Sequence, residues 1–170
     1  MRAFTVTAIV AASVWLGGVG TARAQAPAMW QGFANAWIAS HAARVKGTAP
    51  KEYRKSCEGD VNGDGHSDVV VIYSIEGVGG GNDWTQYATV LTSSQQGYGA
   101  TLPKEVGGKS VRSVEGCTIA GSTVTLDLKT YGPKDGSCCP SVPGKAELKF
   151  EKGALVDPTA PAPTPAGTKK

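Results

Sequence analysis

Residues 60–73 have the sequence Asp-Val-Asn-Gly-Asp-Gly-His-Ser-Asp-Val-Val-Val-Ile-Tyr. The first part is a loop rich in side-chain oxygens, and Asp68 runs directly into the apolar segment Val69–Ile75. That segment is rich in β-branched residues, which is typical of a buried strand. The stretch therefore predicts a compact loop that opens straight into a core strand.

The loop has the pattern D-x-N-x-D-G-x-x-D. Its carboxylates repel one another at short range unless a cation lies between them. Calcium binds six to eight oxygens at about 2.3 to 2.6 Å, and the glycine at position 65 allows the chain to reverse around it. The predicted calcium ligands are the side chains of Asp60, Asn62, Asp64 and Asp68 and the backbone oxygen of His66.

The same residues also suit a turn without metal. Asp and Asn side chains hydrogen-bond to nearby backbone amides, and glycine accepts the backbone angles of tight turns. The sequence leaves both interpretations open.

The loop resembles the calcium loop shared by dockerins, thrombospondin-type repeats and the FG-GAP blades of integrin-like propellers. The resemblance implies a metal and a local geometry. It implies no activity, because such loops occur in proteins of many functions. An EF-hand would place a bidentate glutamate at the twelfth position, which is Val71 here. The chain shows no internal repeat, so a propeller of several blades is not expected.

A longer segment, about residues 55–156, resembles bacterial envelope proteins related to the LppP/LprE lipoproteins. The likeness comprises the loop, the Val-rich strand, a later glycine-rich segment and Cys138-Cys139-Pro140-Ser141. It implies a cell-envelope protein and brings no catalytic residues. The lipid-attachment cysteine of a lipoprotein is missing, which departs from that family.

The chain is predicted to contain three parts. Residues 1–24 have an apolar run followed by Ala22-Arg23-Ala24, the form of a signal-peptidase site. Residues 25–156 form a single domain, and residues 157–170 form a disordered, proline-rich tail. No later stretch is long and apolar enough to span a bilayer. We therefore expect a secreted protein of the bacterial periplasm.

The net charge excludes one class of partner. The chain has 17 basic and 14 acidic residues, a balance of +3 that falls by two when Arg2 and Arg23 leave with the signal peptide. The remaining lysines are scattered, whereas a nucleic-acid binder would carry a basic stripe. We expect no nucleic-acid partner.

The four cysteines, Cys57, Cys117, Cys138 and Cys139, predict two disulfides in an oxidising compartment. Three pairings are possible, and one of them closes a strained eight-membered ring between neighbours. We favour the two crossed pairings, in which Cys57 and Cys117 each bond to one of the neighbours. A reactive vicinal dithiol is the functional alternative.

The predicted fold class is α+β, with an N-terminal amphipathic helix packed on an antiparallel meander sheet. Apolar residues recur at helical spacing from Trp30 to Val45, and Gly47 and Pro50 end the helix. Short turns between the later segments favour antiparallel pairing. The predicted strands cover residues 69–75, 85–92, 98–102, 110–120, 123–131, 146–151 and 154–156.

Catalytic motifs are absent from the sequence. Only His41 and His66 offer imidazole bases, and His41 lies on the apolar face of the predicted helix, where a packed histidine is the common explanation. The leading hypothesis is a monomeric, calcium-binding, non-enzymatic binding or structural domain of the envelope, with an unknown envelope partner or ligand. The alternative is a secreted hydrolase with a site beside the Gly77–Asp83 loop.

Overall fold

The computed structural model describes residues 29–78 and 81–159. The predicted signal peptide, residues 1–24, and residues 160–170 of the predicted tail lie outside this part of the chain. The helices are α1 (Met29–Arg44) and the short 3-10 helix η1 (Lys51–Tyr53). The strands are β1 (Lys55–Gly59), β2 (Asp68–Glu76), β3 (Trp84–Ser94), β4 (Gly97–Ala100), β5 (Lys104–Gly108), β6 (Arg112–Ala120), β7 (Thr123–Thr130), β8 (Val142–Glu151) and β9 (Ala154–Val156).

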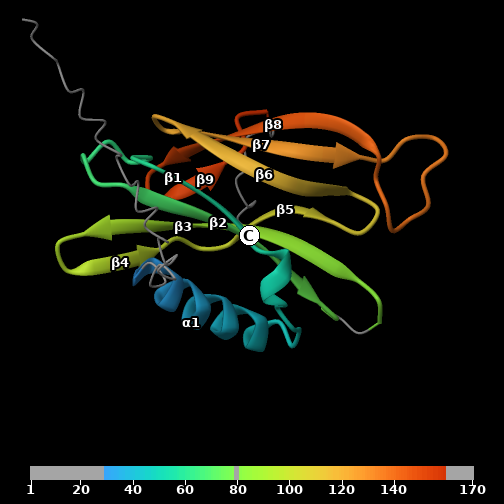
Figure 1. Cartoon of the computed structure of the whole chain (residues 1–170), viewed down its shortest axis with the longest axis horizontal. Helices are drawn as coiled ribbons and strands as arrows, with labels where there is room; N and C mark the ends of the chain where they lie inside the picture. Colours follow the sequence, from blue (N-terminus) through green and yellow to red (C-terminus); the bar gives the residue numbers. More distant parts are fainter. Residues whose placement is uncertain (1–28, 79–80, 160–170) are drawn as a thin grey trace, which may run out of the picture.

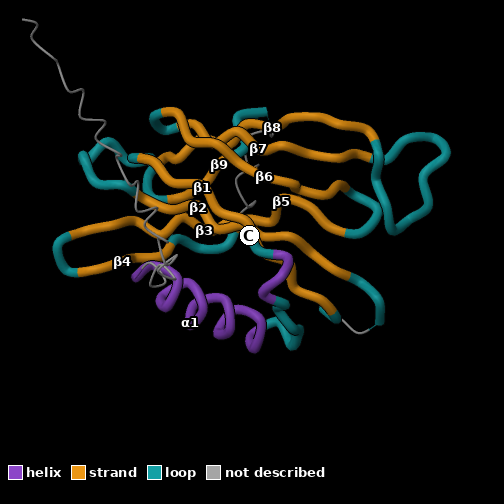
Figure 2. The backbone as a smooth tube through the Cα atoms, viewed as in Figure 1, coloured by secondary structure: helices purple, strands orange, loops and turns teal. Residues whose placement is uncertain are grey.

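The predicted α+β class is wrong, because the fold is mainly β. Strands hold 50% of the described residues and helices 15%, and all nine strands join one antiparallel sheet (Figure 2). The sheet order is β1-β2-β3-β5-β6-β7-β8-β9, with β4 paired to β3. Strands β1 and β5 were not predicted, because their glycines and charged residues have low strand propensity. Pairing with neighbouring strands outweighs that propensity.

The sheet folds back so that its two halves face each other, and α1 covers the outer face of β2 and β3 (Figure 1). Strand β2 is therefore buried on both faces. Its residues Val70 and Ile72 lie in the core between the two halves of the sheet. Val69, Val71 and Tyr73 lie in the core beneath α1. This double burial explains why the strand is apolar without alternation.

The Gln86 side chain connects strands β3 and β6 where the sheet folds back. The pairing of β3 with β5 is irregular between Gln86 and Tyr87. The Gln86 Oε1 atom accepts a hydrogen bond from the Val114 amide at 2.6 Å, and Nε2 donates to the Val114 oxygen at 3.3 Å. Gly107 lies beside these bonds, where a Cβ atom would come within 2.8 Å of Gln86 Oε1. Gln86 thus fixes β6 against β3 in place of a continuous backbone ladder.

The predicted crossed disulfides are wrong. Cys57 on β1 pairs with Cys117 on β6, with Cα atoms 5.7 Å apart, and Cys138 pairs with its neighbour Cys139. The first bridge joins strands that are far apart in the sheet order and are brought together only by the folding of the sheet. The second lies in the connection of residues 131–141, which projects from the end of the sheet (Figure 1).

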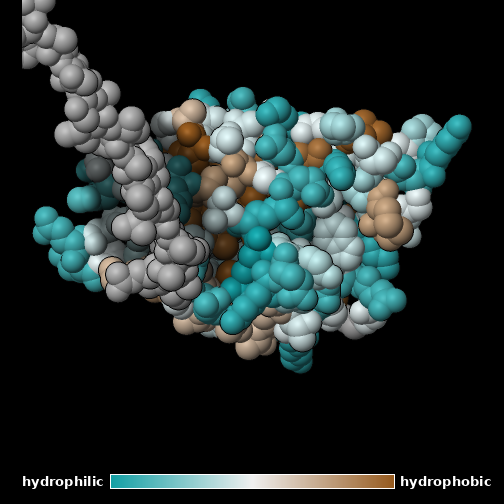
Figure 3. Space-filling view, in the orientation of Figure 1, coloured by the Kyte–Doolittle hydropathy of each residue, from teal (hydrophilic) through white to brown (hydrophobic). Residues whose placement is uncertain are grey.

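The surface is largely hydrophilic on the face shown in Figure 3, with apolar side chains in recesses between polar ones. Neither helix of the described chain combines the length and the apolar character that crossing a membrane requires.

Candidate ligand-binding groove

The predicted calcium loop is closed by hydrogen bonds between its own groups. The Asp60 carboxylate accepts three of them: Oδ1 from the amides of Gly63 at 2.7 Å and Asp64 at 3.1 Å, and Oδ2 from the amide of Gly65 at 2.8 Å. Gly63 and Gly65 have φ angles of 80° and 84°, which favour glycine. Asp60 therefore organises the whole turn.

Asn62 and Asp64 complete the turn. Asn62 Oδ1 accepts a bond from the Asp64 amide, and Asn62 Nδ2 donates to Asp64 Oδ2, both at 2.9 Å. Asp64 Oδ1 accepts a bond from the His66 amide at 2.8 Å. The hydrogen bonds from the His66 amide and from Asn62 lower the pKa of the Asp64 carboxyl. These are the contacts that a metal-free turn would make.

Asp68 lies apart from this exposed turn and is fully buried. Its Oδ2 atom accepts a hydrogen bond from the Val61 amide at 3.1 Å, and its Oδ1 atom accepts one from the Ser93 amide at 2.9 Å. The carboxylate thereby ties the base of the loop to the end of β3. This contact between distant segments gives Asp68 a structural role that the sequence did not indicate.

Within residues 29–78 and 81–159, no three His, Cys, Asp or Glu side chains are grouped so that they could hold a metal ion. The donor chemistry of Asp60, Asn62 and Asp64 still suits a hard cation, since a carboxylate offers about four lone-pair positions. The hydrogen bonds above use two of these positions on Asp64 and three on Asp60. Calcium binding by Asp60, Asn62, Asp64, His66 and Asp68 stays a prediction.

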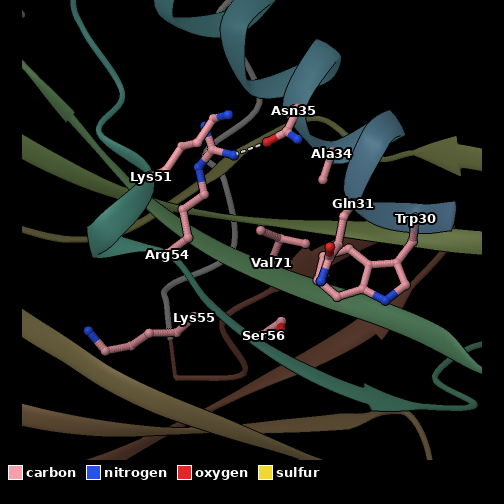
Figure 4. Close-up of a pocket in the computed structure, with 9 residues that line it drawn as sticks. All are labelled: Trp30, Gln31, Ala34, Asn35, Lys51, Arg54, Lys55, Ser56 and Val71. Atoms are coloured by element: carbon pink, nitrogen blue, oxygen red, sulfur yellow. Dashed lines mark hydrogen bonds between the residues drawn. The ribbon is translucent and has the colours of Figure 1, made fainter. Parts of the chain in front are cut away.

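A groove of about 380 Å³ lies between α1, η1 and the first two strands (Figure 4). Arg54 and Asn35 form one end of it, and Trp30 and Gln31 form the other (Figure 4). The full lining comprises Trp30, Gln31, Ala34, Asn35, Lys51, Arg54, Lys55, Ser56 and Val71.

Small side chains keep this groove open. Ala34 is buried on the sheet-facing side of α1, and Ser56 on β1 pairs in register with Val71 on β2. Longer side chains at Ala34 and Ser56 would fill the space between helix and strand. The groove therefore has an apolar floor between a polar end and an aromatic end.

The polar end carries a cation without a counter-charge. Arg54 donates a hydrogen bond to Asn35 Oδ1 and a long one, 3.5 Å, to the Ala49 oxygen. Its Nε atom is buried and has no hydrogen-bond partner within the described chain. Burial lowers the pKa of the guanidinium, and neither ion pair found among the described residues involves it. A buried donor without an acceptor is costly, so a ligand that supplies one would be favoured.

Other features of the groove also favour an anionic ligand. Lys51 and Lys55 add positive charge, and the lining contains no acidic residue. Trp30 supplies an aromatic wall, and its Nε1 atom is a second buried donor with no partner in the part of the chain that the structure describes. The arrangement suits an anionic group attached to an apolar or planar body.

The two histidines lie elsewhere. His41 lies on α1 and is buried against the sheet, where its Nδ1 atom lies 2.7 Å from the hydroxyl of Tyr73 and its imidazole ring is 4.6 Å from the ring of Tyr87. Burial, and secondarily Arg44, lowers the pKa of His41, and burial raises the pKa of Tyr73 to about 12. His66 is exposed on the loop. Among the described residues neither histidine hydrogen-bonds to a carboxylate, so no such pair favours the hydrolase alternative.

The Gly77–Asp83 loop, where the hydrolase alternative placed its site, is described only in part, because residues 79 and 80 lie outside the described residues. The amide of Gly77 donates to the oxygen of Asp83 at 2.9 Å. Lys109 forms an ion pair with Asp83, also at 2.9 Å. These contacts close the loop as a hairpin connection.

The groove beside Arg54 was not predicted from the sequence. Its key residue, Arg54, lies in Lys51-Glu52-Tyr53-Arg54-Lys55, a basic segment that directly follows the end of the predicted helix. That concentration of charge was the available signal. It does not reveal the missing counter-charge, which depends on how α1 packs.

Comparisons with protein-family models, with curated proteins and with solved structures find no match to this chain.

Proposed function

We propose that this protein is a secreted, non-enzymatic binding domain that holds an anionic ligand in the groove between α1 and β1. The observation that carries the proposal is the Arg54 guanidinium, which is partly buried, lacks an acidic partner and has an unpartnered Nε atom. The pairing of all four cysteines in disulfides supports an oxidising, extracytoplasmic compartment. An envelope location is part of the proposal.

The groove indicates the chemical class of the ligand. A guanidinium binds carboxylate and phosphate oxygens with two parallel hydrogen bonds, and Arg54 has its Nε donor unused. Trp30 at the other end would contact an apolar or planar part of the ligand. A cavity of about 380 Å³ accommodates a small molecule or one end of a longer chain.

The test uses benzoate and phenyl phosphate as anionic probes and benzyl alcohol as the neutral control. Titrations followed by NMR should move the Arg54 Nε–H and Trp30 indole signals with an anionic probe and leave them in place with benzyl alcohol. Arg54→Gln should weaken anion binding at least about tenfold, because a hydrogen bond to a charged group is lost.

Arg44→Gln is the matched control, since Arg44 is an arginine of α1 that stacks on Trp37 outside the groove. It should bind the probes as the wild type does. Equal binding by wild type and a folded Arg54→Gln variant, as judged by an unchanged melting profile, would refute the proposal.

Calcium binding by the loop is a separate proposal that rests on its sequence pattern and on the acceptor capacity left on Asp64. Calorimetric titration of the mature protein should give a heat of binding and a raised melting temperature. An Asp60→Ala, Asp64→Ala double variant should show neither. If the two proteins respond alike, the loop is a metal-free turn.

A further inference from the structure

A second groove, of about 360 Å³, lies where β2 ends and β3 begins. It shares only Lys55 with the first groove. Its lining comprises Tyr53, Lys55, Ser74, Glu76, Trp84, Gln86, Ser113 and Glu115. Every one of these side chains carries a hydrogen-bonding atom.

The register of β2 and β3 explains this concentration of polar groups. Ile72 pairs with Ala88, and both lie in the apolar core between the two halves of the sheet. Two residues further along the same face, Ser74 pairs with Gln86, at 5% and 4% exposure, and Glu76 pairs with Trp84 after that. The inner face thus changes from apolar to polar within two pairs. Ser74 places a hydroxyl on this floor, and Gln86 keeps one Nε2 hydrogen beyond its two bonds to the Val114 backbone, so the floor offers polar atoms to a polar ligand.

The β6 residues that line this groove are held in place by hydrogen bonds. Gln86 anchors β6 through its two bonds to the backbone of Val114, which lies between the lining residues Ser113 and Glu115. Ser113 Oγ donates to Glu115 Oε1 at 2.7 Å, which orients that carboxylate and leaves Oε2 available. This arrangement is pre-organised for hydrogen bonding rather than for packing.

The charges of the groove select the kind of polar ligand. Lys55 contributes a cation and Glu76 and Glu115 contribute carboxylates, and none of the three forms an ion pair with another described residue. An amine would satisfy the carboxylates and place a like charge near Lys55. Hydroxyl groups both donate and accept, so a polyhydroxylated ligand satisfies both kinds of charge at once.

We infer that this groove binds a saccharide. Trp84 provides a flat apolar surface for one face of a pyranose ring. Glu76 and Glu115 accept hydrogen bonds from ring hydroxyls, and Lys55 donates to a ring or hydroxyl oxygen. The inference does not depend on the anion-binding groove, because Arg54 and Trp30 take no part in it.

The test is an NMR titration of the disulfide-bonded mature protein with three defined probes: cellotriose, maltotriose and chitotriose. At least one should shift the indole signal of Trp84 and leave that of Trp37 unchanged. Glu115→Gln keeps the side-chain shape and should weaken binding about tenfold, and Trp84→Leu should abolish it. Arg44→Gln serves as the control, with saccharide binding retained, because Arg44 lines neither groove.

The absence of a Trp84 shift with all three trisaccharides would overturn the inference. So would undiminished binding by both the Glu115→Gln and Trp84→Leu variants. Choline is titrated as a fourth probe, and a Trp84 shift with choline but with none of the trisaccharides would also overturn the inference and indicate a cation site. Because Glu115 is exposed, Glu115→Gln should keep the wild-type melting temperature, which separates loss of binding from loss of folding.

Discussion

Replacing Asp68 with asparagine tests the role that the structure gives this residue. The carboxylate is fully buried and accepts one hydrogen bond from the Val61 amide and one from the Ser93 amide. Asp68→Asn preserves the shape of the side chain and replaces one oxygen by an NH2 group. One of the two backbone amides then faces a donor instead of an acceptor.

The magnitude follows from these two bonds. A buried amide left without an acceptor costs about 1 to 3 kcal/mol. The bond that survives changes from a charged to a neutral acceptor, which costs about 1 kcal/mol more. The free energy of unfolding should therefore fall by about 2 to 4 kcal/mol.

Urea denaturation followed by tryptophan fluorescence measures this change, in EDTA and in excess calcium. The loss should be present in EDTA, because the two hydrogen bonds need no metal. An additional loss in calcium would make Asp68 a calcium ligand as well. Asp127→Asn is the control, since Asp127 forms an exposed ion pair with Lys145 at 3.0 Å and should cost less than about 1 kcal/mol. An Asp68→Asn protein as stable as the wild type in EDTA would refute the structural role.

Two further predictions concern stability. The pKa of His41 is below its usual 6.5 in the folded state, so the unfolded chain takes up the proton first as the pH falls. The contribution of neutral His41 to stability is therefore complete above about pH 6.5 and is lost as the pH drops. In urea titrations at several pH values, His41→Gln should show a weaker dependence of stability on pH. Replacing Cys57 and Cys117 by serine should cost about 4 kcal/mol, because their bridge spans 60 residues, whereas replacing Cys138 and Cys139 should cost only about 1 kcal/mol. Similar losses in the two double variants would indicate the crossed pairings.

Local patterns in the sequence predicted several elements of the fold. Helical spacing from Trp30 to Val45 predicted α1, which ends at Arg44, and the β-branched run after Asp68 predicted β2. Both signals depend on side chains close together in the chain, where periodicity is informative. The proportion of residues in strands was underestimated, because β1 and β5 form by pairing with strands elsewhere in the chain.

For the sites too, local features were predictable from the sequence and long-range contacts were not. The residues of the Asp60–Asp68 loop were identified from their spacing, and the hydrogen bonds that Asp60 and Asp64 accept from neighbouring amides are those that the metal-free turn implied. The bond that Asp68 accepts from the Ser93 amide could not be predicted, since 25 residues separate the two. Calcium binding stays a prediction.

The sequence alone determined which segments form α1 and β2, and it determined the chemistry of the loop between Asp60 and Asp68. Only the tertiary structure decided that Cys57 pairs with Cys117, that Arg54 lies in a groove without a counter-charge, and that Ser74 and Gln86 form a polar floor. The physical reason is that burial and partnership are properties of neighbours in space. The folding back of the sheet and the docking of α1 supply those neighbours.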